Sequence, residues 1–373
     1  MPSSYRPTGE TQLLQPGPAG EADLFSPSRA ADVPADSVAL NDSARFLAGM
    51  GSLGGQDAFS ELRAMPEWRA HAERMDALWR DFTLRHARHV SAWADAALGG
   101  LRRSRAVFYP FSGPDFVFAH LFYPYSDTYV MCGLEPCEAL PQWSTLSPGD
   151  VASGCNGLYA GLDTVLQFSY FITKEMRSDF QSTRFRGVLP VFLVFLARTG
   201  HAVESVEGVR LDASGAPSFT AAGTGAPGLH IRFRGAHGSK SLFYFQQDLA
   251  NGGCSPKGPF LQFVSSLGRP AAMAKSASYL MHEPYFSNIR NFIVTHCSGI
   301  AQDPSGVPYR SLAENGWRVS LYGNYVGARD PFEKYEQPAL IDAYTREGGH
   351  PLSFGIGYLT EPQTTSLMVA WPE

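Results

Sequence analysis

Charged residues are scarce in this chain, and neither sign of charge is concentrated in one segment. Lysine and arginine contribute 30 residues and aspartate and glutamate 35, giving a formal net charge of -5 and a charged fraction of 17%, against about 25% in an average globular protein. Because nucleic-acid binding needs clustered basic residues, we expect no nucleic-acid partner. The longest apolar segments, such as residues 188–197, are shorter than the roughly 20 residues that cross a bilayer. We therefore expect a soluble chain with no transmembrane segment.

Cysteine is also rare, which limits the disulfide and metal chemistry. The chain has five cysteines, an odd number and too few for a disulfide scaffold in 373 residues. No CxxC, HExxH or paired Cys/His cluster occurs, so we expect no structural zinc site. Cys132 and Cys137 could pair if the intervening GLEP segment turns back, but Cys132 lies within an apolar strand pattern. A buried free thiol is the favoured interpretation of Cys132.

The N-terminus lacks the basic and apolar regions of a secretory signal. Two interpretations remain open: a cytoplasmic protein, or an exported protein whose leader is absent from this chain. Residues 1–40 are rich in Pro, Ser, Gly and Ala with few large apolar groups, so they cannot offset their ordering entropy by burial. We expect a disordered tail or linker there.

The remaining chain is apolar enough for a large core, with 44% hydrophobic and 13% aromatic residues. Residues 41–104 are expected to be helical, because apolar residues recur there at three- and four-residue spacings on either side of Pro66. We predict that this region is a helical hairpin with a structural role. Residues 105–373 are predicted to form a mixed-sheet α/β domain.

Strands and helices are expected from residue 106 onward. AVFYPF at 106–111 and DTYVMCGLE at 127–135 are typical strands, with a short helix between them that Asp115 can cap, which is the size of a parallel βαβ unit. Short turns join the strand-like segments of 201–247, so these are expected to be antiparallel. The fold class is therefore α/β, a three-layer domain with a mixed, partly antiparallel sheet, preceded by the helical hairpin. Other expected elements are helices at 151–180, 190–199, 257–267, 286–302 and 331–347, and strands at 271–282, 317–325, 351–358 and 366–371.

A first candidate site is the loop YPFSGPD at 109–115, with Ser112 and Asp115, together with Glu135 after the next strand. This strand, loop, helix and second strand resemble the nucleotide-binding half of Rossmann-like proteins, including class I methyltransferases, which implies a cofactor on the loop. Those families use two or three glycines there, whereas this loop has one glycine and two prolines, and Pro114 lacks the N–H that a phosphate would accept. A turn and helix cap is the favoured alternative. Ser112 also lacks the Gly-x-Ser-x-Gly frame of a hydrolase nucleophile.

A second candidate is His282-Glu283, because a carboxylate beside a histidine at a strand end can orient it as a general base. The alternative is a hydrogen-bonded surface pair. Arg290 and Asn291 follow on the next helix.

A third candidate is the polar turn at 303–310, which contains the acid Asp303, the phenol of Tyr309 and the guanidinium of Arg310. The Arg310 guanidinium could bind a carboxylate or phosphate, although an arginine that pairs with a nearby acid explains the turn equally simply.

Two functions are consistent with these patterns. The first is an enzyme that acts on a small anionic substrate in a crevice at the strand ends, because the strands ending near Phe111, Leu134 and Met281 should share one sheet edge. The second is a non-catalytic, exported or envelope-tethered protein that binds a ligand or a protein. The sequence indicates no particular cofactor, small-molecule ligand or oligomeric state. In the enzyme hypothesis the catalytic residues are Asp115, His282 and Glu283, and the substrate-binding residues are Ser112, Glu135, Arg290, Asn291, Tyr309 and Arg310.

Overall fold

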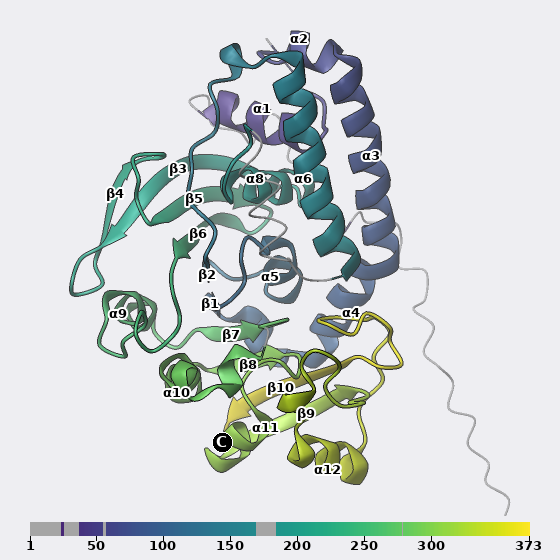
Figure 1. The fold of residues 1–373 in the computed structure, drawn as a ribbon, viewed down its shortest axis with the longest axis vertical. Helices are drawn as coiled ribbons and strands as arrows, with labels where there is room; N and C mark the ends of the chain where they lie inside the picture. The colour runs from purple at the N-terminus through teal and green to yellow at the C-terminus, as the bar shows by residue number, and fades with distance from the viewer. Residues whose placement is uncertain (1–23, 26–36, 55–56, 169–183, 278) are drawn as a thin grey trace, which may run out of the picture.

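The computed structural model describes residues 24–25, 37–54, 57–168, 184–277 and 279–373. Its strands are β1 (Ala106–Tyr109), β2 (Thr128–Gly133), β3 (Ala202–Leu211), β4 (Pro217–Ala221), β5 (Gly228–Gly235), β6 (Gly238–Gln246), β7 (Ala271–Ala274), β8 (Gly299–Gln302), β9 (Trp317–Gly323) and β10 (Ser366–Pro372). In the described part of the chain they form one ten-stranded sheet in the order β4-β3-β5-β6-β2-β1-β7-β8-β10-β9 (Figure 1).

The centre of the sheet is parallel and its two flanks are antiparallel. The pairs β6–β2, β2–β1, β1–β7 and β7–β8 are parallel, whereas β4–β3–β5–β6 and β8–β10–β9 are antiparallel. All residues of β1, β7 and β8 are buried, as in parallel strands covered on both faces. The predicted mixed sheet is confirmed, and β1, β2 and β7 end at the same edge.

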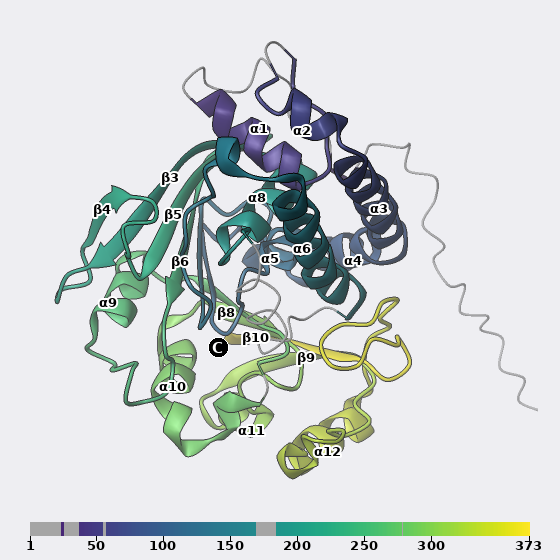
Figure 2. The same cartoon turned by 45° about the horizontal axis from the view of Figure 1, so that its top comes forward.

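Helices cover both faces of the sheet, which confirms the three layers (Figures 1 and 2). Val107 and Tyr109 of β1 belong to one buried core, and Phe108 between them belongs to the other, as the alternation of side chains in a strand requires. The first face carries α1 (Val38–Leu47), α3 (Pro66–Phe82), α4 (Arg88–Ala97), α5 (Phe116–Phe122), α6 (Pro148–Phe168) and α8 (Leu189–Arg198); the second carries α9 (Pro259–Ser266), α10 (Ser287–His296) and α11 (Tyr309–Glu314), while α12 (Pro338–Glu347) packs beside β9 and β10.

The helical region before the sheet is present as predicted, and α3 starts at Pro66. A π-helical turn, Thr83–Ala87, joins α3 to α4, and α3 lies beside α6 (Figure 1). Most of the predicted tail at 1–40 lies outside the described residues. Phe25 is described, and its ring centroid is 5.3 Å from that of Trp79 in α3.

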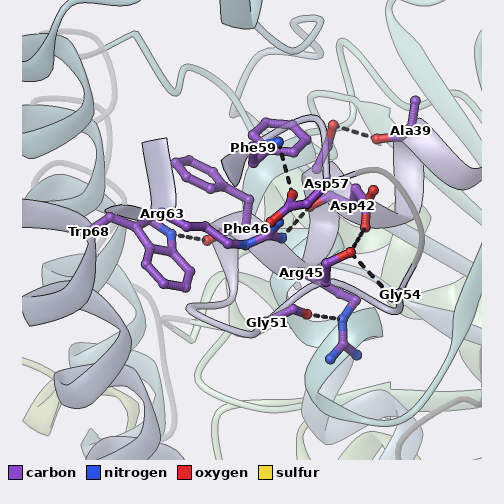
Figure 3. Close-up of polar contacts among 12 residues, drawn as sticks. Ala39, Asp42, Arg45, Phe46, Gly51, Gly54, Asp57, Phe59, Arg63 and Trp68 are labelled. Carbon is purple, nitrogen blue, oxygen red and sulfur yellow. Dashed lines mark hydrogen bonds and ion pairs between the residues drawn. The ribbon is translucent and has the colours of Figure 1, made fainter. Parts of the chain in front are cut away.

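Arg63, in the short helix α2 (Ser60–Ala64), holds the N-terminal helices together (Figure 3). Its side chain is 9% exposed and forms an ion pair with Asp57. The guanidinium carbon also lies 6.0, 5.5 and 5.7 Å from the ring centroids of Phe46, Phe59 and Trp68. Because the indole N–H of Trp68 donates to the Phe46 carbonyl at 3.0 Å, this contact fixes α3 against α1.

Several predicted elements are wrong in position. The strand expected at 271–282 ends at Ala274, because Ser276 and Tyr279 take the left-handed conformation with φ of 53° and 57°, and Leu280–His282 is a 3₁₀ turn. The helix expected at 286–302 ends at His296 and is followed by β8. The helix expected at 331–347 starts only at Pro338.

The strand expected at 351–358 is absent, and β4 was not expected. Gly355 packs against the backbone of Thr360 so closely that a Cβ would overlap it, so this segment folds back on itself. β4 is exposed throughout, and a short exposed edge strand has no apolar pattern to predict it from.

The cysteines and the helices agree with the sequence analysis. All five cysteines are buried free thiols, which confirms the interpretation of Cys132. Among the helices of the described residues, none is long and apolar enough to cross a membrane.

Candidate functional site

Four polar side chains meet where the parallel strands end, and we call them the strand-end cluster: Tyr109, Asp115, Lys275 and Asp303. Tyr109 is the last residue of β1, Lys275 directly follows β7, and Asp303 directly follows β8. Asp115 directly precedes α5. The carboxyl ends of parallel strands are where α/β proteins commonly build ligand sites.

Asp115 and Lys275 form a fully buried ion pair. Lys275 Nζ lies 2.8 Å from Asp115 Oδ2, and each side chain is 2% exposed. The Tyr109 hydroxyl donates to the same oxygen at 2.8 Å. On its other side, Lys275 Nζ lies 3.9 Å from the centroid of the Phe118 ring. One carboxylate oxygen therefore accepts two hydrogen bonds in surroundings that exclude water.

Burial shifts both members of this pair toward their neutral forms. Burial raises the pKa of Asp115, against the lowering effect of Lys275 and Tyr109. Burial likewise lowers the pKa of Lys275, and Asp115 opposes that shift. Desolvation thus narrows the free-energy gap between the ion pair and the neutral acid and amine.

Asp303 fixes the backbone that follows Lys275. Its Oδ2 accepts from the Ser276 N–H at 2.9 Å, and its Oδ1 accepts from the Ser305 N–H at 3.0 Å and the Ser305 hydroxyl at 2.5 Å. A Cβ at Gly357 would overlap Oδ2, so the segment 352–365 packs directly on this carboxylate. Burial raises the pKa of Asp303 as well.

Backbone strain is concentrated beside the cluster. In the described residues, the non-glycine residues with positive φ are Phe111 at 57°, Ser276 at 53° and Tyr279 at 57°. All three follow β1 or β7. Left-handed backbone costs a residue with a Cβ about 1–3 kcal/mol, and it tends to persist at functional sites where the surrounding structure enforces it.

His86 approaches the cluster from the helical layer. It lies in the π-helical turn Thr83–Ala87, and its ring centroid is 5.6 Å from that of Phe118 and 5.9 Å from that of Phe354. Burial and then the charge of Lys275 lower the pKa of His86 to about 4. π-Helical turns are frequent at functional sites because they redirect a side chain.

Of the residues singled out at the first candidate site, Ser112, Asp115 and Glu135, only Asp115 joins the cluster. Asp115 occupies the predicted cap position of α5, although its Oδ2 contacts Lys275 and Tyr109; the Phe118 N–H is among the groups that oppose the burial-driven rise of its pKa. The Ser112 hydroxyl donates to the Cys132 carbonyl at 3.2 Å, and the Ser112 and Gly113 N–H groups donate to the same oxygen at 3.0 and 3.2 Å. Glu135 is buried and accepts from the Tyr244 hydroxyl at 2.9 Å.

The His282-Glu283 pair does not have the predicted geometry. Burial lowers the pKa of His282 to about 4, and its ring packs 5.2 Å from that of Tyr279. Glu283 Oε1 instead accepts from Lys334 Nζ at 2.9 Å and from the Tyr335 hydroxyl. The carboxylate is therefore engaged on the other side and does not orient the imidazole.

The remaining predicted residues have partners outside the cluster or face solvent. Arg290 Nη1 donates to the Met281 carbonyl at 2.7 Å. Arg310 pairs with Glu314 at 2.7 Å and is 79% exposed. The Tyr309 N–H donates to Gln337 at 2.8 Å, and Asn291 is exposed on α10.

Sequence reasoning did not single out Tyr109, Lys275 or His86 as site residues, and it included Asp303 only as the acid of the third candidate turn. Lys275 had a readable signal, since it interrupts the apolar run AAMAKSAS. No pattern could show that β8 brings Asp303 beside it. In the described ranges no group of three or more metal-binding side chains could hold a metal ion.

Comparison with models of protein families, with curated proteins and with solved structures finds no match to this chain. The functional assignment therefore depends on the geometry of the strand-end cluster alone.

Proposed function

We propose that this protein is an enzyme that acts on a small molecule by proton transfer, with Asp115 and Lys275 as the acid–base pair. The observation that carries the proposal is the 2.8 Å contact between two ionisable groups that are each 2% exposed, at the carboxyl edge of a parallel sheet. Shifted pKa values at such an edge are a common property of catalytic groups.

Stability alone is a weak reason for this pair. Removing a charge from water costs roughly several kcal/mol for each ion. A buried ion pair therefore often contributes no more to the free energy of unfolding than apolar side chains of similar volume would. The three strained residues beside it add a further cost. The desolvated ion pair and the strained backbone both lower the stability of the fold at this edge of the sheet. A catalytic role explains their presence better than packing does.

The substrate and cofactor parts of the sequence hypothesis have less support. The anionic substrate depended on Arg290 and Arg310, and both guanidinium groups have partners away from the cluster. A Rossmann-like cofactor depended on the loop N–H groups of Ser112 and Gly113, which donate to Cys132 instead. We therefore limit the proposal to a small molecule held near Lys275.

Hydrogen exchange tests this function without a known substrate. Pyruvate, 2-oxoglutarate, dihydroxyacetone and alanine are incubated with the protein in D₂O, and deuterium uptake at carbon is followed by NMR. We expect uptake in at least one compound and a loss of about 10²-fold or more in Asp115→Asn, the usual contribution of an acid–base group. Asp127→Asn is the control, because Asp127 is half exposed and pairs with Arg105.

Equal exchange in the wild type and Asp115→Asn would contradict the proposal. Stabilisation of the wild type by a panel compound without exchange would favour the alternative, a non-catalytic ligand-binding protein.

A further inference from the structure

We propose that Lys275 is a nucleophile that forms an imine with a small aldehyde or 2-oxo acid. This inference rests on the proposed function, because it requires Asp115 to accept the proton that frees the amine. It goes further by naming the attacking atom, Lys275 Nζ, and the substrate class, a carbonyl compound.

The choice of lysine at this position is the first argument. The chain has 25 arginines and only five lysines. Among the described residues, the other ion pairs with a buried lysine or arginine side chain are those of Arg63, Arg102 and Arg198, and their partners Asp57, Asp95 and Asp76 are more exposed. Arginine suits a permanent buried ion pair, since its guanidinium is planar and always charged. Lysine differs in one useful respect: burial can remove its proton and leave a nucleophilic amine.

The surroundings of Lys275 match the needs of imine formation. Asp115 accepts a proton from the ammonium, and the neutral Nζ attacks the carbonyl carbon to give a carbinolamine. Asp115 then gives that proton to the hydroxyl, which leaves as water, while the Tyr109 hydroxyl, which donates to Asp115 Oδ2 beside Lys275, holds the carboxyl in place. In total, one ammonium and one carbonyl give one protonated imine and one water, with charge conserved. No oxidant or further reactant is needed.

Lys240 provides an internal comparison. It is also buried, and burial lowers its pKa to about 8. Its Nζ, however, donates to the carbonyl oxygens of Pro124 and Ser126 at 2.9 and 2.6 Å. Those carbonyls cannot take a proton. If a lowered pKa alone made a lysine reactive, Lys240 would react; if burial and a neighbouring carboxylate are both required, Lys275 will react and Lys240 will not.

The segment 352–365 covers part of the site. Its Tyr358 hydroxyl donates to the Ser276 carbonyl at 3.1 Å, its Gly357 packs on Asp303, and the Phe354 ring centroid lies 5.9 Å from that of His86. Because Ser276 directly follows Lys275, displacement of this segment opens the chain beside the amine.

Reductive trapping tests the inference. The full-length protein is incubated with pyruvate or glyoxylate and sodium cyanoborohydride, and the modified lysines are identified by peptide mass spectrometry. The five lysines are Lys174, Lys240, Lys257, Lys275 and Lys334. We expect Lys275 to be modified about tenfold or more faster than any other, since an activated lysine exceeds ordinary amines by at least this factor. Asp115→Asn should abolish the preference, because no carboxyl then returns a proton to the leaving hydroxyl even though the amine is easier to deprotonate; thermal melting verifies folding.

Modification spread evenly over the lysines, or led by Lys240, would overturn the inference. The distribution of modification over the lysines is measured on the wild type alone, so this outcome does not depend on whether a variant folds. The two proposals can fail separately. Deuterium exchange that requires Asp115, without trapping at Lys275, would leave the proton-transfer function and remove the imine, whereas loss of both results would remove both.

Discussion

The replacement of Asp115 and Lys275 by apolar residues, singly and together, separates a catalytic pair from a structural one. Asp115→Leu or Lys275→Met leaves the partner buried and uncompensated, which costs about 3–5 kcal/mol of unfolding free energy. Both side chains are 2% exposed, so little of this is relieved by solvent. The double variant removes both charges and should be equal to the wild type in stability or exceed it by about 1–4 kcal/mol.

The pH dependence of Asp115→Leu gives the sign of the Lys275 shift. Burial lowers the pKa of Lys275 in the folded state, and the loss of Asp115 removes the larger of the two groups that oppose this shift, the other being Asp303. Between the lowered pKa of folded Lys275 and the ordinary lysine pKa of 10.5, the unfolded chain then binds more protons than the folded one. Stability therefore rises with pH toward 10.5, by up to about 1.4 kcal/mol per pH unit.

Urea unfolding followed by the fluorescence of the six tryptophans measures all four proteins of this double-mutant cycle. The expected pattern is two destabilised single variants and a restored double variant, with loss of deuterium exchange in all three. A double variant destabilised by the sum of the single effects would refute the reasoning, because the pair would then stabilise the fold through contacts that apolar groups cannot replace.

Three further predictions concern residues around the core and the site. Arg63→Lys should lower the unfolding free energy by about 1–3 kcal/mol in urea titrations, because an ammonium cannot both pair with Asp57 and lie flat against three rings; unchanged stability would contradict this. Burial lowers the pKa of His71 to about 4 from 6.5, so stability should fall by roughly 3 kcal/mol as the pH drops through that range, and His71→Gln should flatten the acid limb of a melting-temperature profile. Gly357→Ala should cost about 1–3 kcal/mol and speed proteolysis within 352–365, because φ is 73° and its Cβ would overlap Asp303; wild-type melting and cleavage would show that the segment adapts.

The fold was readable from the sequence where apolar patterns were long or alternated. β1 and β2 were predicted, and so was α8, whose residues 189–197 are all buried. The parallel centre followed from short apolar strands covered on both faces. The short elements were not readable. β8 has four residues, Gly299–Gln302, and a buried run of that length is equally consistent with the end of a helix.

Of the predicted catalytic and substrate-binding residues, only Asp115 lies in the strand-end cluster. Asp115 was predicted both as a catalytic residue and as a helix cap, since a sequence shows a cap position but not where the carboxylate points. Lys275 was read as part of a strand, and the left-handed Ser276 that ends β7 has no sequence signature. Asp303 and Lys275 are brought together only by the pairing of β7 with β8, a long-range contact that local patterns do not encode.

The central claim is that the Lys275 amine can lose its proton in the folded protein. With five lysines in the chain, NMR of ¹³C-labelled lysine can follow each Cε resonance separately against pH, and Lys275→Arg assigns the signal. The account predicts that Lys275 titrates below the ordinary value of 10.5 and that its midpoint falls further in Asp115→Asn, where the opposing carboxylate is absent. A Lys275 that stays protonated to pH 10.5 or above, as in a permanent structural ion pair, would contradict the account.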